Sequence, residues 1–151
     1  MKKIICVCTG NSCRSVMAWA LLDRIARERH LPIEVSSAGV SPVDGMRPSR
    51  ETRELLLREG IDVSEHRAVR LTEEMIREAD VMLVMERFHR SWIIDHDPSA
   101  LTKTFLLTDY GQAGGETREI IDPISKPMEV YEVCLATIKE AVERVAKTVC
   151  V

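Results

Sequence analysis

The sequence predicts an α/β fold, in which a single doubly wound domain has a small parallel sheet of about four strands flanked by helices. Short apolar runs alternate with longer segments of helical periodicity, which is the pattern of βαβ units around a sheet that is covered on both faces. No internal repeat, low-complexity tract or Pro/Gly/Ser-rich linker divides the chain. Residues 1–151 are therefore expected to form one domain.

The expected strands are short apolar runs that are bounded by polar or turn residues. Residues 81–85 read Val-Met-Leu-Val-Met, which is typical of a central parallel strand buried on both faces. The other expected strands are 3–8, 33–37 and, at an edge of the sheet, 103–107.

The expected helices combine apolar residues at helical spacing with residues that favour helix ends. Residues 128–149 carry one continuous apolar stripe, and residues 15–29 carry a shorter one. Gly60 suits the C-terminal cap of a helix over 49–59, and Thr72 suits the N-cap of a helix over 72–79. A further helix is expected over 86–96.

Composition excludes several classes of partner. The 21 basic and 24 acidic residues leave a net charge of −3, which gives no sequence-wide field for nucleic acid. The longest apolar runs are far shorter than the roughly 20 residues that span a bilayer. The apolar run near the N-terminus is also too short for the core of a signal peptide. Five cysteines without an export signal indicate thiols in a reducing cytoplasm. We expect a cytoplasmic protein with no nucleic-acid or membrane partner, and the oligomeric state stays open.

The segment between the first strand and the first helix is the expected ligand site. Residues 8–15 read Cys-Thr-Gly-Asn-Ser-Cys-Arg-Ser and end at a helix N-terminus, where unpaired backbone N–H groups and the helix dipole attract an anion. Gly10 removes a side-chain barrier to a tight curve, and Asn11 tolerates a left-handed backbone. The Gly-Lys-Ser/Thr ending of a Walker loop is absent, so a nucleotide loop is not expected.

The side chains of this loop fit nucleophilic phosphoryl transfer without a metal ion or cofactor. The anion-binding field favours the thiolate of Cys8, and the Arg14 guanidinium can bind two phosphoryl oxygens at once. Ser15 can donate a hydrogen bond to the sulfur. Asp122, held in an extended backbone before Pro123, is the candidate acid for the leaving group and base for the water that hydrolyses a cysteinyl-phosphate.

These residues resemble the low-molecular-weight protein-tyrosine-phosphatase family. The resemblance rests on Val-Cys-Thr-Gly-Asn-Ser-Cys-Arg-Ser at 7–15, Ser-Ala-Gly at 37–39 and Asp122-Pro123, and it extends over essentially the whole chain. It implies a phosphorylated protein as substrate, with Cys8 as nucleophile, Arg14 as phosphate ligand and Asp122 as general acid. It further implies phosphate-binding and supporting residues, which are Thr9, Gly10, Asn11, Ser12, Cys13, Ser15, Ser37 and His66. Cys13 matches the family's second loop cysteine, which forms a reversible disulfide with the nucleophile.

Departures from the tyrosine-specific pattern indicate which phosphorylated amino acid the protein hydrolyses. Residues 43–45 lack the aromatic residue that walls the phenol pocket, and Ile124-Ser125 stands where a tyrosine pair follows Asp-Pro. Thr9, together with Asp122-Pro123 and the later Glu-Val-Tyr at 129–131, resembles the bacterial protein-arginine-phosphatase branch. A small polar residue at position 9 can position water or contact a guanidinium nitrogen. The sequence therefore favours phosphoarginine over phosphotyrosine.

Two other functions use a similar loop. An arsenate reductase needs two further cysteines to pass a disulfide outward, but only Cys134 and Cys150 lie downstream, on or beyond the last helix. A redox sensor would use Cys8 and Cys13.

Zinc is not expected because no Cys-x2-Cys pair or histidine cluster completes a ligand set, and Cys6 and Cys134 fit packing roles. His66 is equally compatible with a surface or capping role.

Overall fold

The computed structural model describes residues 1–112 and 118–149, so Cys150 lies outside the described part of the chain. The predicted parallel sheet is confirmed, with strand order β2-β1-β3-β4 and every pairing parallel. The strands are β1 (Lys2–Cys8), β2 (Ile33–Gly39), β3 (Val81–Val84) and β4 (Thr104–Leu106). The helices are α1 (Arg14–Glu28), α2 (Arg50–Arg58), α3 (Glu73–Glu78), α4 (Arg87–His96) and α5 (Met128–Thr148).

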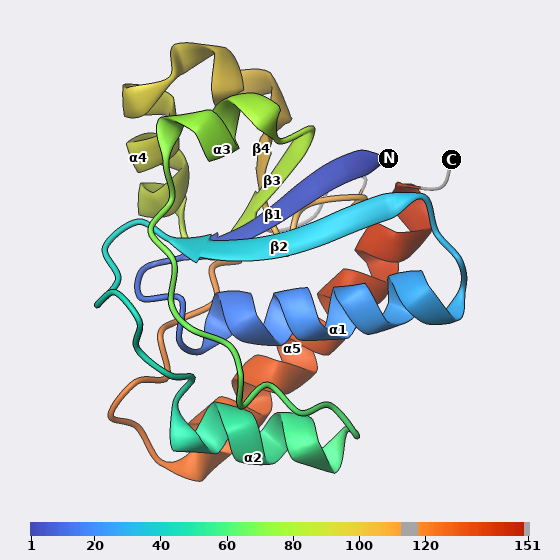
Figure 1. Cartoon of the computed structure of the whole chain (residues 1–151), viewed down its shortest axis with the longest axis vertical. Coiled ribbons are helices and arrows are strands. Elements are labelled where there is room, and N and C mark those ends of the chain that lie inside the picture. The colour runs from blue at the N-terminus through green and yellow to red at the C-terminus, as the bar shows by residue number, and fades with distance from the viewer. Residues whose placement is uncertain (113–117, 150–151) are drawn as a thin grey trace.

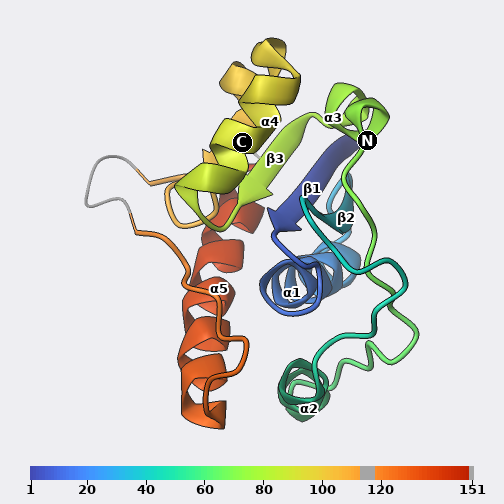
Figure 2. The same cartoon turned by 90° about the vertical axis from the view of Figure 1, so that its left-hand side faces the viewer.

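Helices cover both faces of the sheet, as Figures 1 and 2 show. Because side chains alternate along a strand, Ile4 and Cys6 of β1 enter the core beneath α1 and α5. Ile5 and Val7 enter the second core, which α3 and α4 cover. The strand β1 is thus buried on both faces, and its end is held rigidly between two packed layers.

The carboxyl ends of β1 and β2 meet at the edge where α1 begins (Figure 1). Cys8 pairs with Gly39 in the register of the two strands. A Cβ atom at Gly39 would lie only 2.6 Å from the backbone oxygen of Thr9, so a glycine is needed for this approach. At Gly10, by contrast, a Cβ would lie 3.6 Å from Ser12 Oγ, an ordinary contact. The steric requirement that the sequence assigned to Gly10 therefore belongs to Gly39.

Most element boundaries agree with the expected ones within two residues. The N-cap expected at Thr72 is present, because its side chain accepts from Met75 N. Ser49 caps α2 in the same way by accepting from Thr52 N, which the sequence analysis did not predict. A 3-10 helix at Pro98–Lys103 was not expected and precedes a shorter β4 than the predicted 103–107. Asp97 caps it by accepting from the backbone N–H of Ser99. Within the described ranges, no helix is both long and apolar enough to cross a membrane.

Candidate active site

Asn11 organises the loop between β1 and α1. Its φ of 52° is left-handed, as expected, and its side chain is completely buried. The side-chain amide donates to Ser15 Oγ at 2.7 Å and to Ser37 Oγ at 3.0 Å, while Oδ1 accepts from the backbone N–H of Val69 at 3.0 Å. One side chain therefore ties the loop to α1, to β2 and to the segment that precedes α3.

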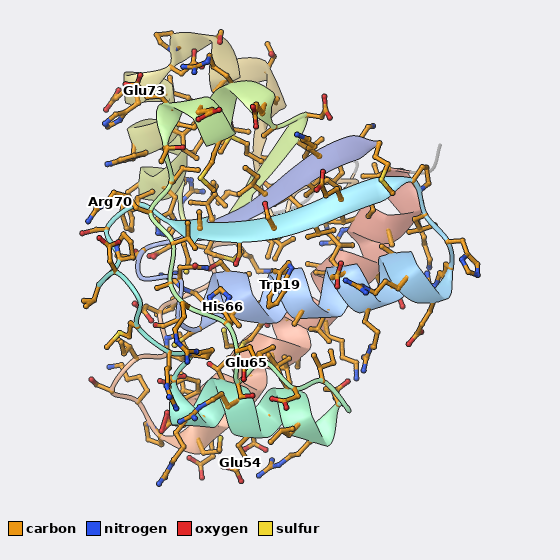
Figure 3. All side chains as sticks on the ribbon, in the orientation of Figure 1. Trp19, Glu54, Glu65, His66, Arg70 and Glu73 are labelled. Carbon is orange, nitrogen blue, oxygen red and sulfur yellow. The ribbon has the colours of Figure 1, made fainter. Side chains whose placement is uncertain are left out.

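His66 holds the same loop from outside. Its Nε2 lies 3.2 Å from the backbone oxygen of Asn11, which can only accept, so Nε2–H is the donor. The ring also lies beside Trp19 of α1, as Figure 3 shows, and the two ring centroids are 5.5 Å apart. Burial lowers the pKa of His66, which favours the neutral ring at neutral pH. The structure thus places His66 in the loop network with Ser37.

Cys8 opens the loop and is only 2% exposed. Its sulfur accepts from the backbone N–H of Asn11 at 3.3 Å and lies 2.9 Å from Ser15 Oγ. Because Ser15 Oγ already accepts from Asn11, its own hydrogen is free to point at the sulfur. Two donors therefore stabilise negative charge on Cys8.

Arg14 is buried at the first position of α1, and three acceptors surround its guanidinium group. Its side chain is 1% exposed, and Nη1 donates to Glu86 Oε2 at 2.7 Å and to the backbone oxygen of Ile120 at 2.5 Å. Asp122 Oδ2 lies 3.7 Å from Nη2, and the Asp122 side chain is 38% exposed. The structure thus brings an accessible carboxylate from a distant part of the chain to the thiol and the guanidinium of the loop.

Two polar residues that contact the loop, Glu86 and His89, were not assigned to the site by the sequence analysis. Glu86 and His89 form the capping box of α4, and each contacts the loop: Glu86 binds Arg14, and His89 Nε2 lies 2.9 Å from Thr9 Oγ1. A signal for Glu86 was present, because it closely follows a buried parallel strand whose carboxyl end lies beside that of β1. His89 had no such signal, because its relation to Thr9 depends on how α4 packs.

A cavity of 250 Å³ opens above the loop. Its polar lining includes Cys8, Thr9, Ser12, Arg14 and Asp122, with Gly10, Cys13 and Ser41 between them. Its remaining walls are aliphatic side chains from two loops, Val43, Met46 and Ile124.

The other cysteines differ from Cys8 in their surroundings. Cys13 is buried, and its thiol donates to Ser49 Oγ at 3.4 Å. Burial raises the pKa of Cys6 and of Cys134 to about 12, which keeps both as inert thiols. Within residues 1–112 and 118–149, no group of three or more His, Cys, Asp or Glu side chains is arranged to hold a metal ion.

The fold and this loop define an α/β protein with a thiol and a buried guanidinium in a cavity at the N-terminus of its first helix. The profile of the low molecular weight phosphotyrosine protein phosphatase family matches residues 3–150. A protein-arginine-phosphatase of Geobacillus stearothermophilus is 36% identical over 146 residues, which cover 96% of this chain and 94% of that protein. A probable low molecular weight protein-tyrosine-phosphatase, EpsP of Ralstonia solanacearum, is 36% identical over 143 residues, covering 95% and 92%.

A solved structure extends the similarity to three dimensions. The YwlE arginine phosphatase, determined as a mutant with a phosphorylated active-site serine, superposes with a TM-score of 0.90 at 32% identity, covering 96% of this chain and 93% of that one. The chain belongs to the low molecular weight phosphotyrosine protein phosphatase family. It is a low-molecular-weight protein phosphatase.

Proposed function

We propose that residues 1–151 form one phosphatase domain that hydrolyses phosphoarginine in proteins through a cysteinyl-phosphate, without a metal ion. The observation that carries the mechanism is the Cys8 sulfur, which receives hydrogen bonds from Asn11 and Ser15 within a cavity that Arg14 and Asp122 also line. The solved relative with a phosphorylated active-site serine supports a covalent intermediate at the nucleophile position.

The first step transfers the phosphoryl group to sulfur. The Cys8 thiolate attacks phosphorus, the S–P bond forms and the P–N bond breaks. The electron pair of the P–N bond goes to the guanidine nitrogen, which takes a proton from Asp122. Loop N–H groups, with Arg14, bind the phosphoryl oxygens.

The second step releases phosphate. Water attacks phosphorus, Asp122 takes a proton from that water, and the S–P bond breaks with its electron pair returning to Cys8. Asp122 suits both steps because its side chain lines the cavity and is 38% exposed, so a leaving group and then a water can reach it.

The lining of the cavity supports phosphoarginine. The aliphatic walls at Val43, Met46 and Ile124 match the three methylene groups of an arginine side chain. None of the described residues that line the cavity is aromatic, so no ring is present to stack on a phenol. The guanidinium N–H groups of the substrate find acceptors in the unprotonated oxygen of the Asp122 carboxyl group and in the hydroxyls of Thr9 and Ser12.

The test compares initial rates on one peptide sequence that carries either phosphoarginine or phosphotyrosine, in reducing buffer with a chelator. Cys8→Ser is the blank, and it should abolish turnover while retaining phosphate binding. We expect a higher kcat/KM for the phosphoarginine peptide. Preference for phosphotyrosine would refute the assignment of the amino acid but leave the mechanism intact, and turnover of neither peptide would refute the proposed function.

A further inference from the structure

His89 has a hydrogen-bond partner on each ring nitrogen, although its side chain is completely buried. The backbone N–H of Glu86 donates to Nδ1 at 3.0 Å, so Nδ1 carries no proton. In the neutral ring the proton is then on Nε2, which lies 2.9 Å from Thr9 Oγ1. The helix cap thus fixes the tautomer, and His89 is the donor to Thr9.

The charges around the ring keep this tautomer neutral. Burial, followed by the nearby positive charge of Arg14, lowers the pKa of His89 from its ordinary 6.5 to about 3. The Glu86 carboxylate is the opposing charge, at 4.0 Å from Nε2, and it is already engaged by Arg14 at 2.7 Å. At neutral pH the ring therefore acts as a fixed donor and not as a proton carrier.

This donor restricts Thr9, the residue that directly follows the nucleophile. One lone pair of the Thr9 hydroxyl is occupied by His89, so the hydroxyl hydrogen must point away from the ring. Thr9 is half-buried and lines the cavity beside Cys8. The acceptors that enter this cavity are the oxygens of a phosphoryl group. A hydroxyl without His89 would distribute its hydrogen and its oxygen over several orientations.

We propose that His89 is a positioning residue, which holds the Thr9 hydroxyl as a hydrogen-bond donor to the phosphoryl group bound in the loop. The inference rests on the proposed function for the identity of the ligand. The same helix cap also orients Arg14 through the Glu86 carboxylate, so the N-terminus of α4 contacts both the beginning and the end of the phosphate-binding loop.

A matched pair of substitutions separates the two nitrogens of His89. In His89→Asn, the side-chain oxygen can replace Nδ1 as acceptor for Glu86 N–H, but nothing reaches Thr9. In His89→Gln, the amide nitrogen can replace Nε2 as donor to Thr9, but the acceptor for Glu86 is lost. Thr9→Val removes the hydroxyl at nearly constant shape, and the double variant Thr9→Val/His89→Asn tests whether the two residues act together.

The readouts are kcat/KM on both phosphopeptides, the calorimetric affinity for inorganic phosphate and the melting temperature. We expect His89→Asn and Thr9→Val each to lower kcat/KM and phosphate affinity about fivefold, the effect of one neutral hydrogen bond. His89→Gln should stay within about twofold of the unsubstituted protein in both readouts while melting at a lower temperature, since it loses one capping hydrogen bond. The double variant should have the same kcat/KM and phosphate affinity as Thr9→Val alone, because the two residues act through one hydrogen bond.

The outcomes are distinguishable. Equal losses in His89→Asn and His89→Gln that follow the melting temperature would indicate a structural role only and overturn the proposal. The proposal would also be overturned if the fold-losses of kcat/KM in the two single variants multiplied in the double variant. Unchanged phosphate affinity in His89→Asn would overturn it as well. Failure to hydrolyse either peptide would refute the proposed function, but phosphate affinity would still decide the role of His89.

Discussion

Replacing Asn11 by alanine should destabilise the protein by about 4 kcal/mol. The substitution removes three side-chain hydrogen bonds, to Ser15, Ser37 and the backbone N–H of Val69, at 2.7, 3.0 and 3.0 Å. At about 1 kcal/mol for each net hydrogen bond, these account for about 3 kcal/mol. Alanine tolerates the φ of 52° less well than asparagine does, which adds about 1 kcal/mol.

Equilibrium unfolding in urea measures this loss. With a denaturant slope of about 2 kcal/mol per molar, the midpoint should fall by about 2 M. Ser37→Ala is the matched control, because it removes only one of the three hydrogen bonds and should lower the midpoint by about 0.5 M. If Asn11→Ala shifted the midpoint no more than Ser37→Ala, the idea that Asn11 stabilises the loop through several simultaneous bonds would be refuted.

Further predictions concern the acid, the close backbone approach and the buried ring. Asp122→Asn should lower kcat by about 10² to 10⁴ and leave phosphate affinity undiminished, and undiminished turnover would contradict the acid role. Gly39→Ala should lower both melting temperature and activity because its Cβ would lie 2.6 Å from Thr9 O, whereas Gly10→Ala, with 3.6 Å to the nearest atom, should melt like the unsubstituted protein. His89 binds a proton more readily in the unfolded state than in the folded state, because its pKa is lowered on folding. The stability that the neutral, buried ring contributes is therefore complete above about pH 6.5 and is lost as the pH falls toward 3. Urea midpoints at pH 7 and pH 5 should therefore differ less in His89→Asn, and an unchanged difference would contradict the lowered pKa.

The sequence by itself determined the features that are encoded locally. The loop at 8–15 is contiguous, so a thiol, a left-handed asparagine and a guanidinium could be placed at a helix N-terminus from their order alone. The parallel sheet followed from apolar runs that alternate with amphipathic helices, since strands that helices cover on both faces are typically apolar throughout. Ends of elements were less certain, as the short β4 shows, because an edge strand depends on its neighbour more than on its own residues.

Tertiary structure decided which distant side chains contact that loop. Glu86 and His89 contact the loop only because β3 lies beside β1, which brings the start of α4 to the same edge of the sheet as Cys8. The sequence pointed to Gly10 as the glycine that the loop requires, but the structure shows that it is Gly39. The reason is similar, since a side chain at Gly39 is excluded by the backbone of a neighbouring segment. Hydrogen bonds between residues far apart in the chain depend on packing angles and on helix positions, and neither periodicity nor a local motif specifies these.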